Sequence, residues 1–118
     1  MHKNNGEVMM NFEEFQAWLI NNFNQNTERR FDTLGGRSCF YVRYNSNSKV
    51  VSIKRSTGNQ GQLNDDQIRK VFERYNTGSQ SERDMTSFYT DTYWENTPDR
   101  ILAPYVAAVI KTWGEKGQ

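Results

Sequence analysis

Residues 38–55 read SCFYVRYNSNSKVVSIKR, and this stretch has the sequence pattern of two β-strands joined by a turn. Between Ser38 and Tyr44, large apolar side chains alternate with other residues, and Lys49–Arg55 repeats the alternation. Successive residues of a β-strand point to opposite faces of a sheet, so both runs are predicted to be strands with one buried face. The Asn-Ser-Asn-Ser sequence between them is typical of a turn. The two runs are therefore predicted to form an antiparallel hairpin.

The two faces of this hairpin differ in character. Phe40, Val42 and Tyr44 share one face of the first strand, which leaves Tyr41 and Arg43 on the other. A shorter run, Arg30–Leu34, comes before the hairpin and ends at two glycines that signal a turn. Together the three runs predict a three-stranded antiparallel meander.

Helical patterns lie on both sides of the meander. Asn11 is predicted to cap a first helix over residues 12–23, whose apolar residues recur at helical spacing. Residues 56–62 are predicted to be a polar loop, and Asn64 is predicted to cap a second helix that stops at Gly78. A short third helix after Ser81 and a last helix complete the pattern. The last helix is predicted to start near 97–99, to be interrupted or restarted at Pro104, and to end at Gly114.

The predicted fold is one α+β domain over residues 1–118, with element order α-β-β-β-α-α-α and the three-stranded meander packed against helices. Residues 1–10 and 115–118 are predicted to be flexible. The chain has 118 residues, of which 14% are aromatic, enough for one core of large rings.

The composition also indicates the cellular compartment in which the protein is expected. A single cysteine, Cys39, cannot form an intramolecular disulfide, which favours a reducing compartment. No apolar run approaches the roughly 18–20 residues that cross a bilayer, and the first residues lack the pattern of a secretion signal. We therefore expect a cytoplasmic protein without a membrane partner.

The residues for common catalytic plans are missing from the sequence. The only histidine is His2, near the chain start, so neither a Ser-His nor a Cys-His pair is expected on a rigid scaffold. No metal-ligand spacing and no glycine-rich nucleotide fingerprint occurs. Asp32 and Lys54 resemble part of a carboxylate-and-lysine nuclease site, but Ser52 stands where that pattern requires an acid. We expect a non-enzymatic protein with no cofactor and no metal.

Charge is distributed unevenly along the chain. The net charge is only +1, but residues 29–55 carry +6 and residues 79–97 carry −3. Cations interleaved with tyrosines on a sheet are typical of surfaces that stack bases and hold phosphates. The main hypothesis is therefore a binding face for nucleic acid or another polyanion, made of Arg37, Tyr41, Arg43, Lys49, Lys54 and Arg55. The competing interpretation is that these charges only solvate an exposed sheet.

Three further patterns are open to more than one interpretation. Residues 54–61 combine cations, hydroxyls and glycines before a helix and could bind an anion, although Asp65 and Asp66 at that helix start oppose it. Asp91, Glu95 and Asp99 are predicted to be solvated acids rather than metal ligands. Aromatic residues near the C-terminus offer an alternative site for a small ligand or a partner protein, with a homodimer as one form. That alternative set is Tyr89, Tyr93, Trp94 and Tyr105.

Two resemblances follow from these residues. The α-β-β-β-α order of residues 11–78 is similar to that of double-stranded-RNA-binding domains. Those domains begin the helix after the meander with lysines, whereas this chain has Asn64-Asp65-Asp66-Gln67, so RNA binding through that helix is not implied. The whole chain, through stretches such as 56–59 and 103–108, also resembles small proteins of mobile elements such as integron gene cassettes. That resemblance implies no functional residue.

Overall fold

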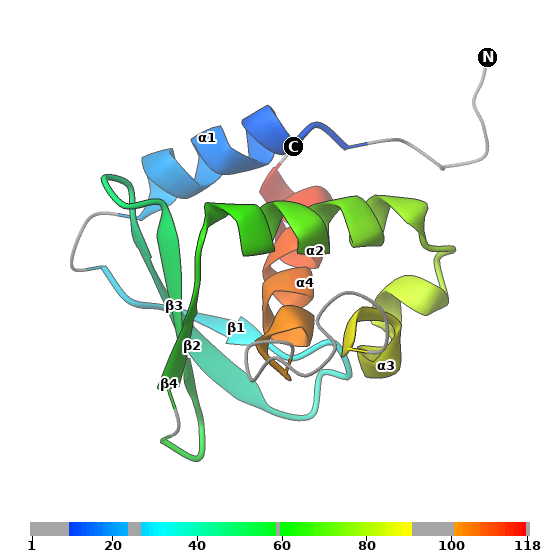
Figure 1. Ribbon diagram of the computed structural model, residues 1–118. Helices are drawn as coiled ribbons and strands as arrows, with labels where there is room; N and C mark the ends of the chain where they lie inside the picture. The colour runs from blue at the N-terminus through cyan, green and yellow to red at the C-terminus, as the bar shows by residue number, and fades with distance from the viewer. Residues whose placement is uncertain (1–9, 24–26, 59, 91–100, 118) are drawn as a thin grey trace.

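The computed structural model describes residues 10–23, 27–58, 60–90 and 101–117. It confirms the α+β class, because helices pack against one antiparallel sheet. The elements follow in the order α1, β1, β2, β3, β4, α2, α3 and α4 (Figure 1).

The sheet contains four strands instead of the three that were predicted. Its strands lie side by side in chain order, and each pairs antiparallel with the next. They are β1 (Arg29–Asp32), β2 (Cys39–Asn45), β3 (Val50–Arg55) and β4 (Gln60–Leu63). The first three match the predicted meander to within two residues at each end.

β4 corrects the prediction that residues 56–62 form a loop. Its sequence, Gln-Gly-Gln-Leu, holds one large apolar residue, so alternation alone gives no strand signal. The strand exists because β3 offers its backbone for pairing, with Val51 opposite Leu63 and Ile53 opposite Gly61. A Cβ atom at Gly61 would lie 2.5 Å from Cδ1 of Leu102, so the glycine makes room for a side chain from the C-terminal part of the chain. The fourth strand also separates this order from that of double-stranded-RNA-binding domains.

Three helices cover one face of the sheet (Figure 1). They are α1 (Phe12–Asn22), which contacts β2, α2 (Asp65–Thr77), which contacts β3 and β4, and α4 (Ala103–Thr112), which contacts β1. The strand side chains beneath them are buried at alternate positions, as predicted for the hairpin. The buried strand residues are Phe31, Phe40, Val42, Tyr44, Val51, Ile53 and Leu63.

An aromatic cluster joins the helices to each other. The Phe15 ring of α1 lies 5.4 Å from the Phe72 ring of α2 and 5.3 Å from the Trp113 ring that follows α4. Each aromatic side chain buries roughly 150–250 Å², so such a cluster supplies much of the hydrophobic stabilisation. The aromatic share of the sequence is thus concentrated where the three helices meet.

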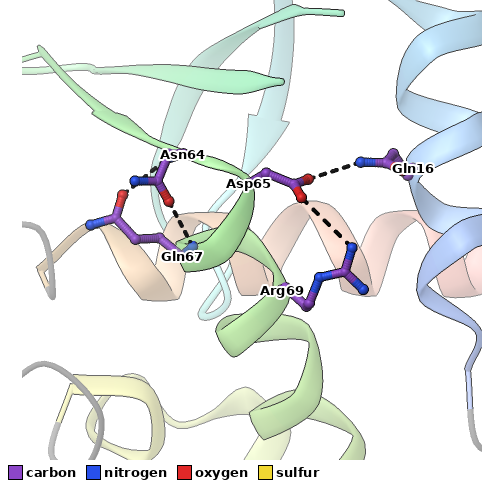
Figure 2. A network of polar contacts seen from close by, with 5 residues as sticks. All are labelled: Gln16, Asn64, Asp65, Gln67 and Arg69. Carbon is purple, nitrogen blue, oxygen red and sulfur yellow. Dashed lines mark hydrogen bonds and ion pairs between the residues drawn. The ribbon is translucent and has the colours of Figure 1, made fainter. Parts of the chain in front are cut away.

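A polar network fixes the start of α2 against α1 (Figure 2). Asn64 and Gln67 form the predicted capping box, with N–H to side-chain oxygen distances of 2.9 and 2.8 Å. Asp65 then accepts a hydrogen bond of 2.8 Å from Gln16 of α1 and pairs with Arg69 one turn further along α2 at 3.6 Å. One carboxylate therefore contacts both helices.

The end of α2 and the start of the next helical segment differ from the prediction in their details. Gly78 ends α2, as predicted, but with an ordinary φ of −84°. A glycine is needed at this position for a steric reason, because a Cβ atom there would lie 2.6 Å from the Phe88 ring. Ser79, not Ser81, exchanges backbone-to-side-chain hydrogen bonds with Glu82. A 3-10 turn, Glu82–Asp84, then leads into α3 (Thr86–Thr90).

The last helix confirms one prediction and corrects another. α4 begins at Ala103 with Pro104 in its first turn, which is the predicted fresh start. The start predicted at residues 97–99 lies outside the described residues. Gly114 does not end the helix, because the chain continues in a wider π-helical turn over Trp113–Gly117. Trp113 is 3% exposed, and its packing against the aromatic cluster holds this turn in place.

Within the described residues, no helix has the length and apolar character that crossing a membrane requires.

Candidate nucleic-acid interface

The candidate site is the second face of the sheet, which we call the open face because no helix of the described residues covers it. Strand alternation places Tyr41 and Arg43 of β2 on this open face, together with Ser52 and Lys54 of β3. Arg43 and Lys54 are exposed, whereas Tyr41 and Ser52 are half-buried among their neighbours. The predicted separation of core and surface residues on β2 and β3 is therefore correct.

The register of the strands places the side chains of the open face in rows that run across the sheet. Tyr41 is paired with Arg30 of β1 on one side and with Lys54 of β3 on the other, and Lys54 is paired in turn with Gln60 of β4. Neighbouring strands are about 4.8 Å apart, so the Arg30 and Lys54 positions flank Tyr41 with about 10 Å between them. The adjacent row consists of Arg43, Ser52 and Gln62. A tyrosine between two cations is thus the central feature of this face.

A shallow hollow of about 240 Å³ lies over these rows. Its walls come from β2, β3, β4 and the residue before β1. The lining residues are Glu28, Tyr41, Arg43, Ser52, Ile53, Lys54 and Gln60. This volume is below the roughly 300–1,000 Å³ of typical small-molecule pockets, and it suits part of a chain lying across the sheet.

Acidic groups moderate the positive charge of the open face. Arg43 Nε lies 3.7 Å from Glu28 Oε2, and both side chains remain partly exposed, at 54% and 33%. Arg30 has its pKa raised by a hydrogen bond with Cys39 and, further, by the charge of Asp32. Exposed pairs of this kind contribute little to stability and are open to exchange with an external anion.

Three of the predicted cations lie away from this row. Arg37 lies in the turn between β1 and β2, and Lys49 lies in the turn between β2 and β3, so they occupy opposite ends of β2. Arg55 is opposite Phe40 in the register and therefore points to the helix side of the sheet. Its Nε is buried, with no hydrogen-bond partner in the described part of the chain. The expectation that Arg55 joins the open face is wrong, because the strand alternation of β3 continues to its last residue.

Arg30 belongs to the open face, although the sequence-based site omitted it. The signal was present in the alternation Arg30-Phe31-Asp32, which places Phe31 inside and its two neighbours outside. What the sequence did not reveal is the register, which brings Arg30 beside Tyr41.

The anion loop predicted over residues 54–61 has a different structure. It is the hairpin between β3 and β4, in which Gly58 has a φ of +94° and donates its N–H to the carbonyl of Arg55 at 2.8 Å. The whole of β4 separates this turn from the start of α2. The turn therefore does not join a helix N-terminus to make a shared anion site.

Two members of the alternative aromatic set, Tyr89 and Tyr105, lie in the described part of the chain. Tyr89 is 1% exposed, and its hydroxyl donates to the carbonyl of Arg83 at 2.6 Å; burial raises its pKa. Tyr105 is half-buried with its ring 5.0 Å from that of Phe40. Tyr93 and Trp94 lie outside the described residues. Tyr89 is thus a core residue and not a contact for an external ligand.

The described part of the chain contains no cluster of side chains that could hold a metal ion. No three histidine, cysteine or acidic residues there come together as ligands. Asp32 and Lys54 share the open face, but β2 lies between their strands, so they do not form the adjacent pair that a nuclease site needs. Asp91, Glu95 and Asp99 lie outside the described residues.

None of the family models, curated proteins and solved structures compared with this chain matches it. The resemblance to mobile-element proteins therefore stays a prediction.

Proposed function

We propose that the open face binds nucleic acid, single strands above all, without catalysing a reaction on it. Tyr41 stacks on a base, while Arg30 and Lys54 hold the phosphates on either side. The observation that supports this most directly is the cross-strand row in which the tyrosine lies between the two cations. Base stacking on aromatic side chains and phosphate contacts from cations are the two main contributions to single-strand binding.

The neighbouring polar groups support the same proposal. Ser52, Gln60 and Gln62 offer hydrogen-bond donors and acceptors on the same face, and Gln62 Nε2 already donates to Ser52 Oγ at 3.4 Å. Arg43 can exchange Glu28 for a phosphate because the pair is exposed. The face therefore combines stacking, phosphate contact and base-edge hydrogen bonding.

Salt dependence tests the proposal quantitatively. Binding of labelled 12-nucleotide DNA and RNA strands is measured by fluorescence anisotropy from low to physiological salt. Each phosphate contact on a single strand contributes about −0.7 to the slope of log K against log salt, so three cations predict a slope of about −2. A duplex control of equal length should bind less tightly, since its bases cannot stack on Tyr41.

Variants separate stacking from charge. Tyr41→Ala should weaken binding roughly tenfold or more, because a stacked base contributes about 1–3 kcal/mol, whereas Tyr41→Phe should keep most of the affinity. Lys54→Ala should make the slope less negative by about 0.7, whereas Lys49→Ala, which removes an exposed cation in a turn, should leave it unchanged. The proposal fails if no strand binds at about 20 mM salt, or if Tyr41→Ala and Lys54→Ala bind as the parent does.

A further inference from the structure

β1 is an edge strand whose outer backbone groups have no strand to pair with in the described part of the chain. The N–H of Thr33 donates to the carbonyl of Ser38 at 3.0 Å, which fixes the phase of the β1–β2 ladder. Hydrogen-bonded and non-hydrogen-bonded pairs alternate in an antiparallel ladder, so Arg30 and Asp32 occupy the non-hydrogen-bonded positions. Their N–H and C=O groups therefore point outward, away from β2.

The helix side of this edge is open as well. A groove of about 800 Å³ runs along β1 and the turn after it, and its far wall is made by α1 and α4. Trp18 of α1 and Ala108 and Lys111 of α4 are among the residues that line it. A neighbouring strand would thus meet unpaired backbone at the edge and free space beside it.

We infer that β1 pairs antiparallel with β1 of a second copy of this chain, so that the two sheets join into one sheet of eight strands. Only Arg30 and Asp32 have outward-pointing backbone groups in β1, which leaves few registers for such pairing. If Arg30 lies opposite Arg30 of the partner subunit, or Asp32 opposite Asp32 of the partner subunit, like charges meet. The register centred on Phe31 instead places Arg30 opposite Asp32 of the partner subunit, and the two-fold axis repeats the pair.

Side-chain placement agrees with this register. Arg30 and Asp32 both point to the open face, so the two opposite-charge pairs lie on the same side of the joined sheet. Charges on an edge strand normally discourage pairing, but the order Arg-Phe-Asp is self-complementary in this one arrangement. An arginine has five N–H donors, so an Arg30 that faces a carboxylate keeps others for a phosphate. The inference stands independently of the proposed nucleic-acid binding.

Sedimentation equilibrium of the full chain tests this pairing. Four residues of strand and the groove rim form a contact smaller than the ~800 Å² per partner of a standard interface, so association is expected in the micromolar range. The protein is examined from about 5 to 500 µM, and its mass should rise from monomer to dimer. A mass that stays monomeric up to the highest concentration overturns the inference.

Charge reversal identifies the register. Arg30→Asp and Asp32→Arg should each weaken association about tenfold or more, because each turns two attractive pairs into two repulsive ones. The double variant Arg30→Asp/Asp32→Arg restores opposite charges and should dimerise within about threefold of the parent. Lys49→Asp is the matched control, since it reverses an exposed charge in a turn remote from β1 and should dimerise normally. Circular dichroism verifies that all variants fold. A dimer that both single reversals leave unchanged, or that the double variant does not restore, contradicts the assigned register.

Discussion

The two faces of the sheet are built from the same strands but differ in how far their side chains are buried. On the helix side, Phe40, Val42 and Ile53 are at most 1% exposed and lie against helices. On the open side, their chain neighbours Tyr41, Arg43 and Lys54 remain half-buried or exposed. Residues one position apart therefore carry stability on one face and the proposed binding on the other.

This difference shows how a small domain can keep its fold while its surface is free to change. Hydrophobic stabilisation is proportional to the apolar area that is removed from water, and that area lies mainly on the side of the sheet that the helices cover. The open face therefore contributes little to the free energy of unfolding. Substitutions on the helix side should consequently change the free energy of unfolding, whereas substitutions on the open face should change binding and leave stability nearly unaltered.

Removing a ring from the buried face should have the largest effect. Phe40 is fully buried and packs against the Phe31 and Tyr105 rings at 5.9 and 5.0 Å. Phe40→Ala should lower the free energy of unfolding by about 3–5 kcal/mol, and Phe40→Leu by less, whereas Tyr41→Ala should change it by under about 1 kcal/mol. Urea denaturation followed by tryptophan fluorescence measures all three. Equal losses from Phe40→Ala and Tyr41→Ala would break the comparison between the faces.

The polar network at the start of α2 should contribute an intermediate amount. Asp65→Ala removes the hydrogen bond from Gln16 and the pair with Arg69, so a loss of about 1–2 kcal/mol is expected. Asp66→Ala removes a neighbouring first-turn acid that is exposed, and should cost only a few tenths of a kcal/mol through the helix dipole. Comparing the urea midpoints of the two variants isolates the link between α1 and α2. If both variants lose the same stability, the contact with Gln16 is not stabilising.

The smallest effect should come from Glu82, an exposed residue in the 3-10 turn between α2 and α3. The backbone N–H of Ser79, and then its hydroxyl, lower the pKa of Glu82 below its ordinary 4.5. A lowered native pKa stabilises the fold above the unfolded pKa, and the contribution disappears as the pH falls through the native value. The difference in urea midpoint between the parent and Glu82→Gln should therefore be present at neutral pH and shrink below about pH 4.5. A difference that stays constant with pH would contradict this assignment.

Local patterns predicted most of the helices and strands, and the exceptions have physical reasons. Asn11 and Asn64 cap α1 and α2 as their sequences indicate, because a capping side chain needs only backbone groups two or three residues away. β4 was missed because its pairing partner, not its own sequence, makes it a strand. The helical turn after Gly114 was missed for a similar reason, since the distant Phe15 and Phe72 rings hold Trp113.

The candidate site was predictable only in part. The alternation within a strand correctly places Tyr41 and Phe40 on opposite faces. The same alternation extends to the last residue of β3, so Arg55 points to the helix side and not to the open face, where it was expected. Arg30 and Lys54 lie 24 positions apart in the chain, and only the register places them on either side of Tyr41.

The alternation along β2 and β3 and the capping residues Asn11 and Asn64 were readable from the sequence, because each depends on residues close in the chain. Only the folded chain shows the fourth strand, the row that joins three strands across the open face, and the position of β1 at the edge of the sheet. Those features depend on which strands pair and in which register, so they follow from contacts between residues that are far apart in the chain.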